Sequence, residues 1–292
     1  MKFVDTSLLR IGYEEHNLSG ARVCVLLHGW PDSIRTWSGV VPVLVAAGWR
    51  VLVPALRGFV PTTFLRSGTP RTGQLAAIGR DLIEFIDAMK LDRPVLVGHD
   101  WGARAVANAC GLRAGIASHM VMLSVGYGTN NPKQAITLEL ARNYWYHWYM
   151  NTPRGVTTLH EDRRNFARTM WDTWAPAGWY APAEFEATAA AFDNDDWPEV
   201  TRHSYTHRWD HSPGDSHYAA DDAALTPAPV LEVPTLLLHG EADGVTPVSV
   251  SAGKEAFFRN RYERILLPGV GHFPQREAPA HVAALIAQFI EK

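Results

Sequence analysis

The chain has 292 residues, of which 47% are hydrophobic, so it can bury a large core in one or two domains. Its formal net charge is -3 with acids and bases interspersed, which argues against nucleic acid or an anionic membrane as a partner. The N-terminus lacks the pattern of a signal peptide and no run of about 18 apolar residues occurs, so we expect a cytoplasmic protein. The two cysteines, Cys24 and Cys110, have the apolar surroundings of buried residues rather than of a disulfide or metal framework.

The first 125 residues alternate between strand and helix patterns. A hairpin is expected over 2–5 and 8–14. Apolar, β-branched runs predict strands at 22–27, 50–54, 95–97 and 119–125, and helical spacing predicts helices at 38–47, 74–90 and from 101 to about 110. Alternating strands and helices indicate a mostly parallel sheet covered by helices on both faces, with an active site at the carboxyl ends of the strands.

This alternation stops between residues 126 and 224, where the sequence is rich in Trp, Tyr and His and its pattern is helical. We interpret this segment as a helical cap with an apolar pocket between it and the sheet. The sheet pattern then resumes with strands at 234–240 and 262–267 and helices at 247–258 and 279–290. The predicted domains are a core in two parts, residues 1–125 and 225–292, and an inserted cap, residues 126–224.

A Gly-x-Asp-x-Gly pattern at residues 98–102 separates a predicted strand from a predicted helix. Gly98 and Gly102 allow the close strand-to-helix approach of a nucleophile elbow, with Asp100 where the esterase version has serine. A carboxylate with a pKa of ~4 is already ionised at neutral pH. It is a weak nucleophile, suited to a carbon that bears a halide or a strained ring oxygen, and it would form an ester on the enzyme itself.

Releasing such an ester requires a water activated by a His–acid pair. Asp243 and His272 follow two different late strands, so both can converge on Asp100, in the chain order of an α/β-hydrolase. Glu241 is a rival acid, while His239 is expected to be a core histidine and His99 to point away from the nucleophile.

The loop His28-Gly29-Trp30-Pro31 ends another strand, and the Trp30 and Trp101 amides together could form an oxyanion hole. The spacing of His203, His207 and His211 suggests a metal site, but Pro213 ends any helix there and no Cys is near, so we expect no metal and no cofactor.

At this point the chain resembles the epoxide hydrolases and their dehalogenase relatives in the α/β-hydrolase superfamily. The resemblance rests on HGWP at 28–31, GHDWGA at 98–103, GEADGVTP around Asp243 and GVGHFPQREAP around His272. In the family, two cap tyrosines donate hydrogen bonds to the epoxide oxygen. Tyr205 resembles the second of these, and Tyr146 matches the first, with the neighbouring Tyr144 and Tyr149 as alternatives.

The same segment keeps a dehalogenase hypothesis open. His147-Trp148 resembles the halide-binding pair of fluoroacetate dehalogenases, and Arg104 matches one of their two carboxylate-binding arginines, whereas Trp101 stands where the other would be. Haloalkane dehalogenases keep a Trp beside the nucleophile, but a common version has Asn where Trp30 stands. The loop Arg57-Gly58-Phe59-Val60-Pro61 departs from the usual Arg-Gly-aromatic-Gly of epoxide hydrolases.

The sequence therefore predicts a cofactor-independent epoxide hydrolase, monomer or homodimer, that acts on a small apolar or aryl-bearing epoxide with water. The alternatives are a hydrolytic dehalogenase that uses the same triad and a non-catalytic binding protein on this fold.

Overall fold

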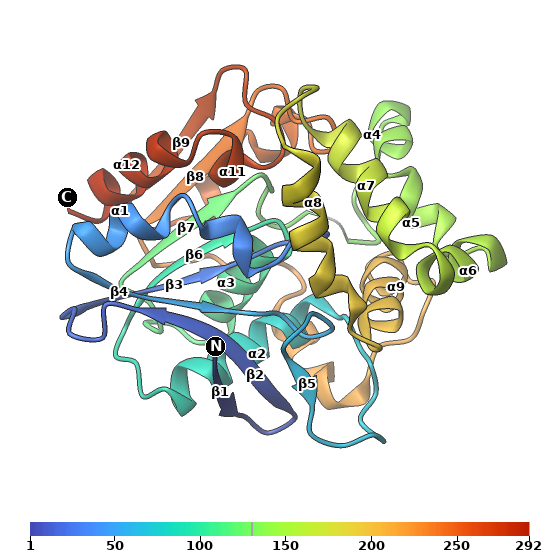
Figure 1. Ribbon diagram of the computed structural model, residues 1–292, viewed down its shortest axis with the longest axis horizontal. Coiled ribbons are helices and arrows are strands. Elements are labelled where there is room, and N and C mark those ends of the chain that lie inside the picture. The colour runs from blue at the N-terminus through green and yellow to red at the C-terminus, as the bar shows by residue number, and fades with distance from the viewer. Residues whose placement is uncertain (130, 292) are drawn as a thin grey trace.

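The computed structural model describes residues 1–129 and 131–291, and within them one nine-stranded sheet forms the centre of the molecule (Figure 1). Its strands are β1 (Lys2–Asp5), β2 (Leu9–His16), β3 (Arg22–Leu27), β4 (Trp49–Pro54), β5 (Thr63–Phe64), β6 (Val95–His99), β7 (His119–Leu123), β8 (Thr235–Gly240) and β9 (Tyr262–Leu267). The order is β1-β2-β4-β3-β6-β7-β8-β9, with β5 beside β2. The strands from β4 to β9 along this path pair in parallel, and β1, β2 and β5 are antiparallel additions at one edge.

Helices cover both faces of this sheet, as an α/β-hydrolase fold requires. The core helices are α1 (Val41–Ala46), α2 (Leu75–Ala88), α3 (Trp101–Leu112), α11 (Pro274–Glu277) and α12 (Pro279–Ile290). Along β3, Val25 and Leu27 pack in the cluster that contains α2 and α3, whereas Cys24 and Leu26 pack in the cluster that contains α1 and α12. Because successive side chains of a strand point to opposite faces, this split places an apolar layer on each side of the sheet.

The chain between β7 and β8 is helical. It contains α4 (Leu138–Asn143), α5 (Trp145–Tyr149), α6 (Pro153–Glu161), α7 (Arg163–Trp174), α8 (Pro182–Ala189), α9 (Trp197–His207) and α10 (Ala219–Ala224). Figure 1 shows α4 to α9 gathered to one side of the sheet, at the right of the view. The indole of Trp171 in α7 donates to the Pro31 carbonyl over 2.8 Å, which fixes these helices to the loop after β3. In contrast, α10 contacts the core helices α2 and α3.

Two predicted helices differ from the structure. The helix expected at 247–258 is wrong, since only short 3-10 turns form at Val248–Ser251 and Glu255–Phe257. Gly253 lies between them with φ +65, a left-handed conformation that ends a helix. The helix expected at 38–47 is shorter and spans Val41–Ala46, with Pro42 in its first turn, where a missing N–H costs nothing.

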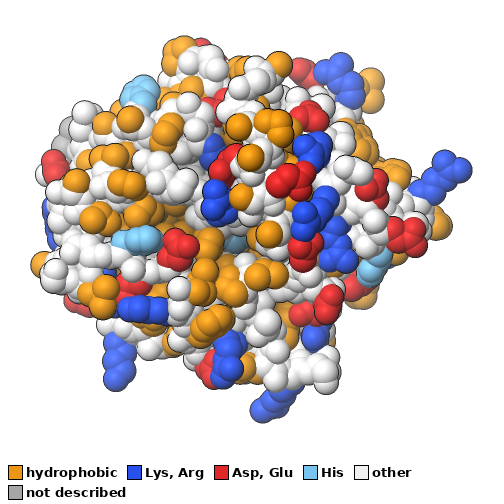
Figure 2. All heavy atoms as spheres, viewed as in Figure 1, with side chains coloured by type: hydrophobic (Ala, Val, Ile, Leu, Met, Phe, Trp, Pro, Cys, Tyr) orange, Lys and Arg blue, Asp and Glu red, His pale blue; other side chains and the backbone are white. Residues whose placement is uncertain are grey.

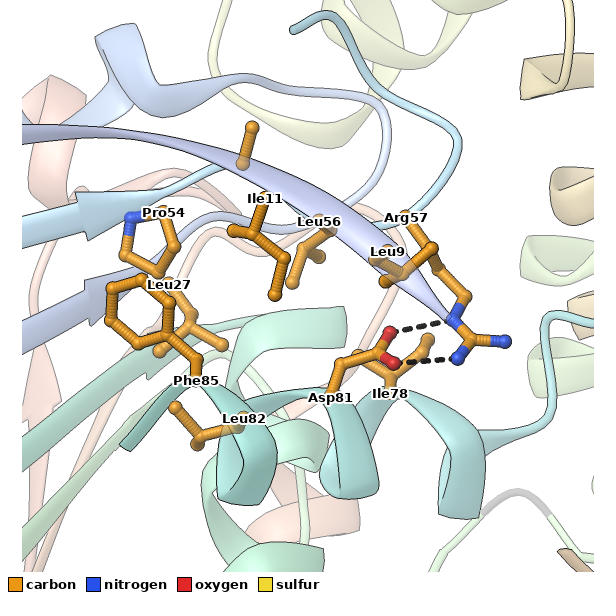
Figure 3. Close-up of a pocket in the computed structure, with 11 residues that line it drawn as sticks. Leu9, Ile11, Leu27, Pro54, Leu56, Arg57, Ile78, Asp81, Leu82 and Phe85 are labelled. Atoms are coloured by element: carbon orange, nitrogen blue, oxygen red, sulfur yellow. Dashed lines mark hydrogen bonds and ion pairs between the residues drawn. The ribbon is translucent and has the colours of Figure 1, made fainter. Parts of the chain in front are cut away.

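A small cavity lies between β2 and α2, lined by apolar side chains and the Arg57–Asp81 ion pair (Figure 3). Its volume of about 20 Å³ is enough for about one water molecule. None of the predicted catalytic residues lines this cavity. A cavity of this size is too small for an organic substrate.

On the face drawn in Figure 2, basic and acidic side chains alternate over α8, and no area of this face carries a single charge sign. Pairs such as Arg164 with Asp193, and Arg35 with Glu184, account for part of this mixture. Among the described residues, no helix is both long and apolar enough to cross a lipid bilayer. Location in the cytoplasm and a monomeric or homodimeric state stay predictions.

Candidate active site

Asp100 lies in the turn between β6 and α3, with the strained backbone angles φ 50 and ψ -111. The two glycines beside it are required by close packing. A Cβ on Gly98 would lie 2.2 Å from the Gly102 carbonyl oxygen, and a Cβ on Gly102 would lie 2.3 Å from the Leu27 oxygen. Strand and helix can therefore approach only with glycine at both positions, and the turn holds the Asp100 side chain in a fixed place.

One oxygen of this carboxylate is already bound by a backbone amide. Trp30 N donates to Asp100 Oδ1 over 2.9 Å. Trp101 occupies the first position of α3, where backbone N–H groups have no intrahelical acceptor. The Trp30 amide thus contacts Asp100, the part of the Trp101 amide in an oxyanion hole stays a prediction, and the Trp30 indole donates to Thr201 Oγ1 of α9 over 3.1 Å.

His272 and Asp243 form a buried pair that faces the other oxygen of Asp100. His272 Nδ1 donates to Asp243 Oδ2 over 2.8 Å, and His272 Nε2 lies 3.9 Å from Asp100 Oδ2 with no hydrogen-bond partner among the described residues. The amides of Val245 and Thr246 donate to Asp243 Oδ1 over 2.9 and 2.8 Å. These contacts commit both Asp243 oxygens, orient the imidazole and leave Nε2 free toward Asp100.

The pKa values of His272 and Asp243 depend on burial and on neighbouring charges. Burial alone would raise the pKa of Asp243, but His272 and His239 lower it below its ordinary value. Burial alone would lower the pKa of His272, but Asp243, and next Asp100, raise it. An ionised acid beside a basic imidazole is the arrangement that general-base chemistry uses.

The other candidates for the acid and the base, Glu241, His239 and His99, make different contacts. Glu241 is exposed to solvent. His239 is fully buried, with Nδ1 2.8 Å from Ser251 Oγ and Nε2 2.8 Å from the Thr246 oxygen and 3.3 Å from Asp243 Oδ2, so this core histidine contacts the acid. His99 also points away from the Asp100 carboxylate, and its Nε2 lies 2.7 Å from the His272 carbonyl oxygen. Burial, and next the charge of His272, lowers the pKa of His99 to about 4, so His99 supports the His272 backbone as a neutral donor.

Glu277 binds the loop that carries His272. No motif in the sequence predicted this contact. Gly271 N donates to Glu277 Oε2 over 2.7 Å, and Phe273 N donates to Glu277 Oε1 over 2.9 Å. One carboxylate therefore accepts from the residues on both sides of His272. The position of an acid five residues after His272 is the one signal that the sequence offers.

Tyr205 reaches the site from α9. Its hydroxyl accepts a hydrogen bond from Trp101 Nε1 over 3.1 Å, and the residue is only 1% exposed. An indole N–H can only donate, so the phenol proton of Tyr205 stays available for another acceptor. Burial, and next the charge of Asp100, raises the pKa of Tyr205 well above its ordinary value, which keeps the phenol protonated.

Tyr146 is the tyrosine of α5 that meets Tyr205. Its ring stacks on the Trp30 ring at 5.5 Å and lies 5.1 Å from the ring of Tyr205, and burial raises its pKa well above the ordinary value. Tyr144 stacks on His147 instead, and Tyr149 places its hydroxyl 2.9 Å from Thr158 Oγ1. The structure thus brings Tyr146 and Tyr205 together beside Trp30, and neither neighbouring tyrosine shares this position.

The predicted pocket residues, His147, Trp148 and Arg104, each make hydrogen bonds within the protein. His147 is buried, and its Nδ1 accepts from Trp209 Nε1 over 2.9 Å. The Trp148 indole N–H donates to the Ala141 carbonyl over 3.1 Å, so it is not free to bind a halide. Arg104 is buried and donates to the Thr129 carbonyl over 3.0 Å.

The three histidines whose spacing suggested a metal site, His203, His207 and His211, contact other groups of the protein. His203 places Nδ1 3.1 Å from Gly73 N and Nε2 3.0 Å from the Pro213 oxygen, and it stacks on His207. His211 Nδ1 lies 2.7 Å from the side-chain nitrogen of Asn151. Both ring nitrogens of His203 are therefore engaged within the protein. Nowhere in residues 1–129 and 131–291 do three or more His, Cys, Asp or Glu side chains converge as metal ligands.

Known proteins resemble this chain in sequence and in fold. A family model described as the alpha/beta hydrolase fold matches residues 23–279. The chain belongs to the α/β-hydrolase family. Within this family it is similar to epoxide hydrolase A of Mycobacterium tuberculosis, with 28% identity over 99% of this chain and 96% of that protein. These matches place this α/β-hydrolase among hydrolytic enzymes and confirm the resemblance drawn from its motifs.

Solved structures of α/β-hydrolases extend the likeness. A Klebsiella pneumoniae protein described as a candidate epoxide hydrolase superimposes with a TM-score of 0.92 at 31% identity, covering 100% of this chain and 97% of that one. Potato epoxide hydrolase I superimposes with a TM-score of 0.79 at 20% identity, covering 99% of this chain and 98% of that one. The second likeness shows the shared fold alone.

Proposed function

We propose that this α/β-hydrolase opens an epoxide to a vicinal diol through an ester on Asp100, and that residues 126–224 form the cap that closes over the reaction. The observation that carries the proposal is the placement of two buried, protonated tyrosines, Tyr146 and Tyr205, against Trp30, whose amide binds Asp100. A nucleophilic carboxylate with two phenol donors suits an epoxide, because its ring oxygen leaves only when it receives a proton. The similarity to epoxide hydrolase A of Mycobacterium tuberculosis and to the Klebsiella pneumoniae protein supports the same reaction.

In the first step, Asp100 Oδ2 attacks an epoxide carbon and the bond between that carbon and the ring oxygen breaks. The oxygen takes a proton from Tyr146 or Tyr205, which leaves a tyrosinate. Asp100 Oδ1, bound to the Trp30 amide, becomes the carbonyl oxygen of the ester.

In the second step, His272 takes a proton from water and the resulting hydroxide attacks the Asp100 carbonyl carbon. The charge that develops on Oδ1 is met by the amides of Trp30 and Trp101. The bond from this carbon to Oδ2 breaks, and the product alkoxide takes the proton held by His272. The proton left on the new Asp100 carboxyl returns to the tyrosinate. One epoxide and one water have then become one diol.

The dehalogenase alternative has less support from the contacts of the indoles. The N–H groups of Trp30, Trp101 and Trp148 donate to Thr201, Tyr205 and Ala141. A halide ion would have to displace one of these hydrogen bonds. Tyr205 accepts from the Trp101 indole and keeps its own phenol proton, so the contacts favour an epoxide over a halide substrate.

A single-turnover reaction in H2(18)O tests the proposal. With enzyme in excess over styrene oxide, the first diol carries an oxygen from Asp100 and no label. In this turnover the label enters Asp100. It reaches the diol only when more styrene oxide is added and the labelled enzyme turns over again. Label in the diol of the first turnover would show direct attack by water, and halide release from haloalkanes or haloacetates without any diol formation would show a dehalogenase.

A further inference from the structure

Two buried arginines next to the proposed site lack acidic partners. Arg208, 5% exposed, donates from Nε to the Ser204 carbonyl over 2.8 Å and from Nη2 to Ser204 Oγ over 2.7 Å. Arg104, 8% exposed, donates to no described residue other than Thr129. In contrast, Arg57 pairs with Asp81 and Arg276 with Asp32. Within the described residues, Arg104 and Arg208 form no ion pair, although an unpaired buried charge is costly.

Unused hydrogen-bond donors accompany these cations. Arg104 Nε is buried and has no hydrogen-bond partner within residues 1–129 and 131–291. His147 Nδ1 accepts from the indole of Trp209, which fixes the proton of the neutral imidazole on Nε2, and this Nε2 is also buried without a partner. Burial, and next the charges of Arg208 and Arg104, lowers the pKa of His147 well below its ordinary value, so the ring stays neutral. Among the described residues these cations thus have no carboxylate of their own, since Asp100, whose charge acts on Arg208, is the proposed nucleophile.

Arg208 and His147 both lie against Tyr205, and the charge of Arg104 acts on each of them. The Arg208 guanidinium carbon lies 4.3 Å from the centre of the Tyr205 ring, and the His147 ring centre lies 4.5 Å from it. Burial, with a contribution from the charge of Arg104, lowers the pKa of Arg208 to about 10, which leaves it a cation at neutral pH. A group bound here would therefore belong to the molecule whose epoxide oxygen meets Tyr205.

We infer that the natural substrate is an epoxide that carries a carboxylate, bound by Arg208 and Arg104 with the Nε2–H of His147 as a further donor. The inference rests on the proposed epoxide hydrolase function and narrows its substrate class. A carboxylate supplies the missing acceptor and the missing negative charge at once. The apolar surroundings of Tyr146 and Trp30 accommodate the rest of the molecule, so an aryl-bearing epoxy acid fits both parts of the site.

A matched pair of substrates tests the inference. 3-Phenylglycidate carries the carboxylate, and 3-phenylglycidamide has nearly the same shape without the charge. We expect kcat/KM to be at least about tenfold higher for the acid, because two charge-assisted hydrogen bonds are lost with the amide. Arg208→Gln should remove most of this preference through a higher KM for the acid, and Arg208→Lys should restore part of it.

The control variant is Arg163→Gln. Arg163 is also a helical-segment arginine without an acid, but it donates only to carbonyl oxygens of Phe192, Asn194 and His160. Its loss should leave the ratio of acid to amide unchanged. If Arg208 acts only on the Tyr205 ring, Arg208→Gln lowers kcat/KM for both substrates equally, which would overturn the inference.

Two further outcomes separate the inference from the function on which it rests. Hydrolysis of both substrates with equal kcat/KM by the wild-type protein would overturn the carboxylate site and keep the epoxide hydrolase. Hydrolysis of neither substrate nor styrene oxide would overturn both.

Discussion

The amide of Trp30 and the carboxylate of Asp100 lie 2.9 Å apart across 70 residues of sequence. This contact gives the two carboxylate oxygens different surroundings, since Oδ1 accepts from the backbone and Oδ2 lies toward His272 Nε2. An ester formed on Oδ2 would thus already have its carbonyl oxygen in the oxyanion hole.

The contact depends on a glycine. A Cβ on Gly29 would lie 2.5 Å from Asp100 Cβ and 2.8 Å from the His99 oxygen. We expect Gly29→Ala to lose activity and to destabilise the protein by about 1–3 kcal/mol, because the backbone must shift. Urea denaturation and an epoxide assay measure both effects. The control is Gly68→Ala, where nothing lies within 4 Å of the added Cβ. Wild-type behaviour of Gly29→Ala would contradict the packing argument.

Loss of the Tyr205 hydroxyl should affect both activity and stability. Tyr205→Phe removes a proton donor to the epoxide, so formation of the ester should slow by about 10²-fold or more. It also leaves Trp101 Nε1 without its acceptor, at a cost of about 1–3 kcal/mol. Stopped-flow tryptophan fluorescence reports the first effect and thermal denaturation the second. The Tyr149→Phe variant, altered at a hydroxyl that contacts Thr158, should form the ester at the wild-type rate.

The pH dependence should follow His272. Its imidazole is a base only when neutral, so hydrolysis of the ester rises as the pH passes upward through its pKa and is lost below it. Asp243, and next Asp100, raises that pKa. Asp243→Asn should therefore move the acid limb to lower pH while slowing the plateau by about 10²- to 10⁴-fold. Single-turnover rates across the acid limb measure the shift. A limb that stays in place would mean that another group titrates.

Glu277 should matter for the second step alone. Glu277→Gln leaves one oxygen for the two amides of Gly271 and Phe273, so the loop that carries His272 loses a hydrogen bond. Because small displacements of a catalytic group are costly, we expect ester hydrolysis to slow by about tenfold or more. Ester formation should be unchanged, so the ester accumulates. Glu232→Gln, in an exposed pair with Arg259, is the control. Equal slowing of both steps would show a general loss of structure instead.

The strand ends and the elbow could be predicted from sequence because their signals are local. The fold class was predicted correctly, and Asp100, Asp243 and His272 each follow a strand of the parallel sheet, so the fold alone brings them to one edge. The helix expected at 247–258 was wrong because apolar spacing does not reveal the left-handed Gly253.

Other features depend on tertiary contacts that no local pattern contains. Tyr144, Tyr146 and Tyr149 have similar surroundings in sequence, and only packing shows that Tyr146 stacks on Trp30. Nothing around Arg208 in the sequence indicates that it is buried without an acid, since that depends on every segment packed around it.

The most direct test of the aspartyl ester is intact-protein mass spectrometry of His272→Gln after incubation with styrene oxide. This variant can form the Asp100 ester but lacks the base that hydrolyses it. We predict a mass gain equal to one whole styrene oxide, which is lost when Asp100→Asn is added to the variant. A gain that persists without the Asp100 carboxylate, or no gain from an epoxide that the wild-type protein hydrolyses, would contradict the covalent role of Asp100.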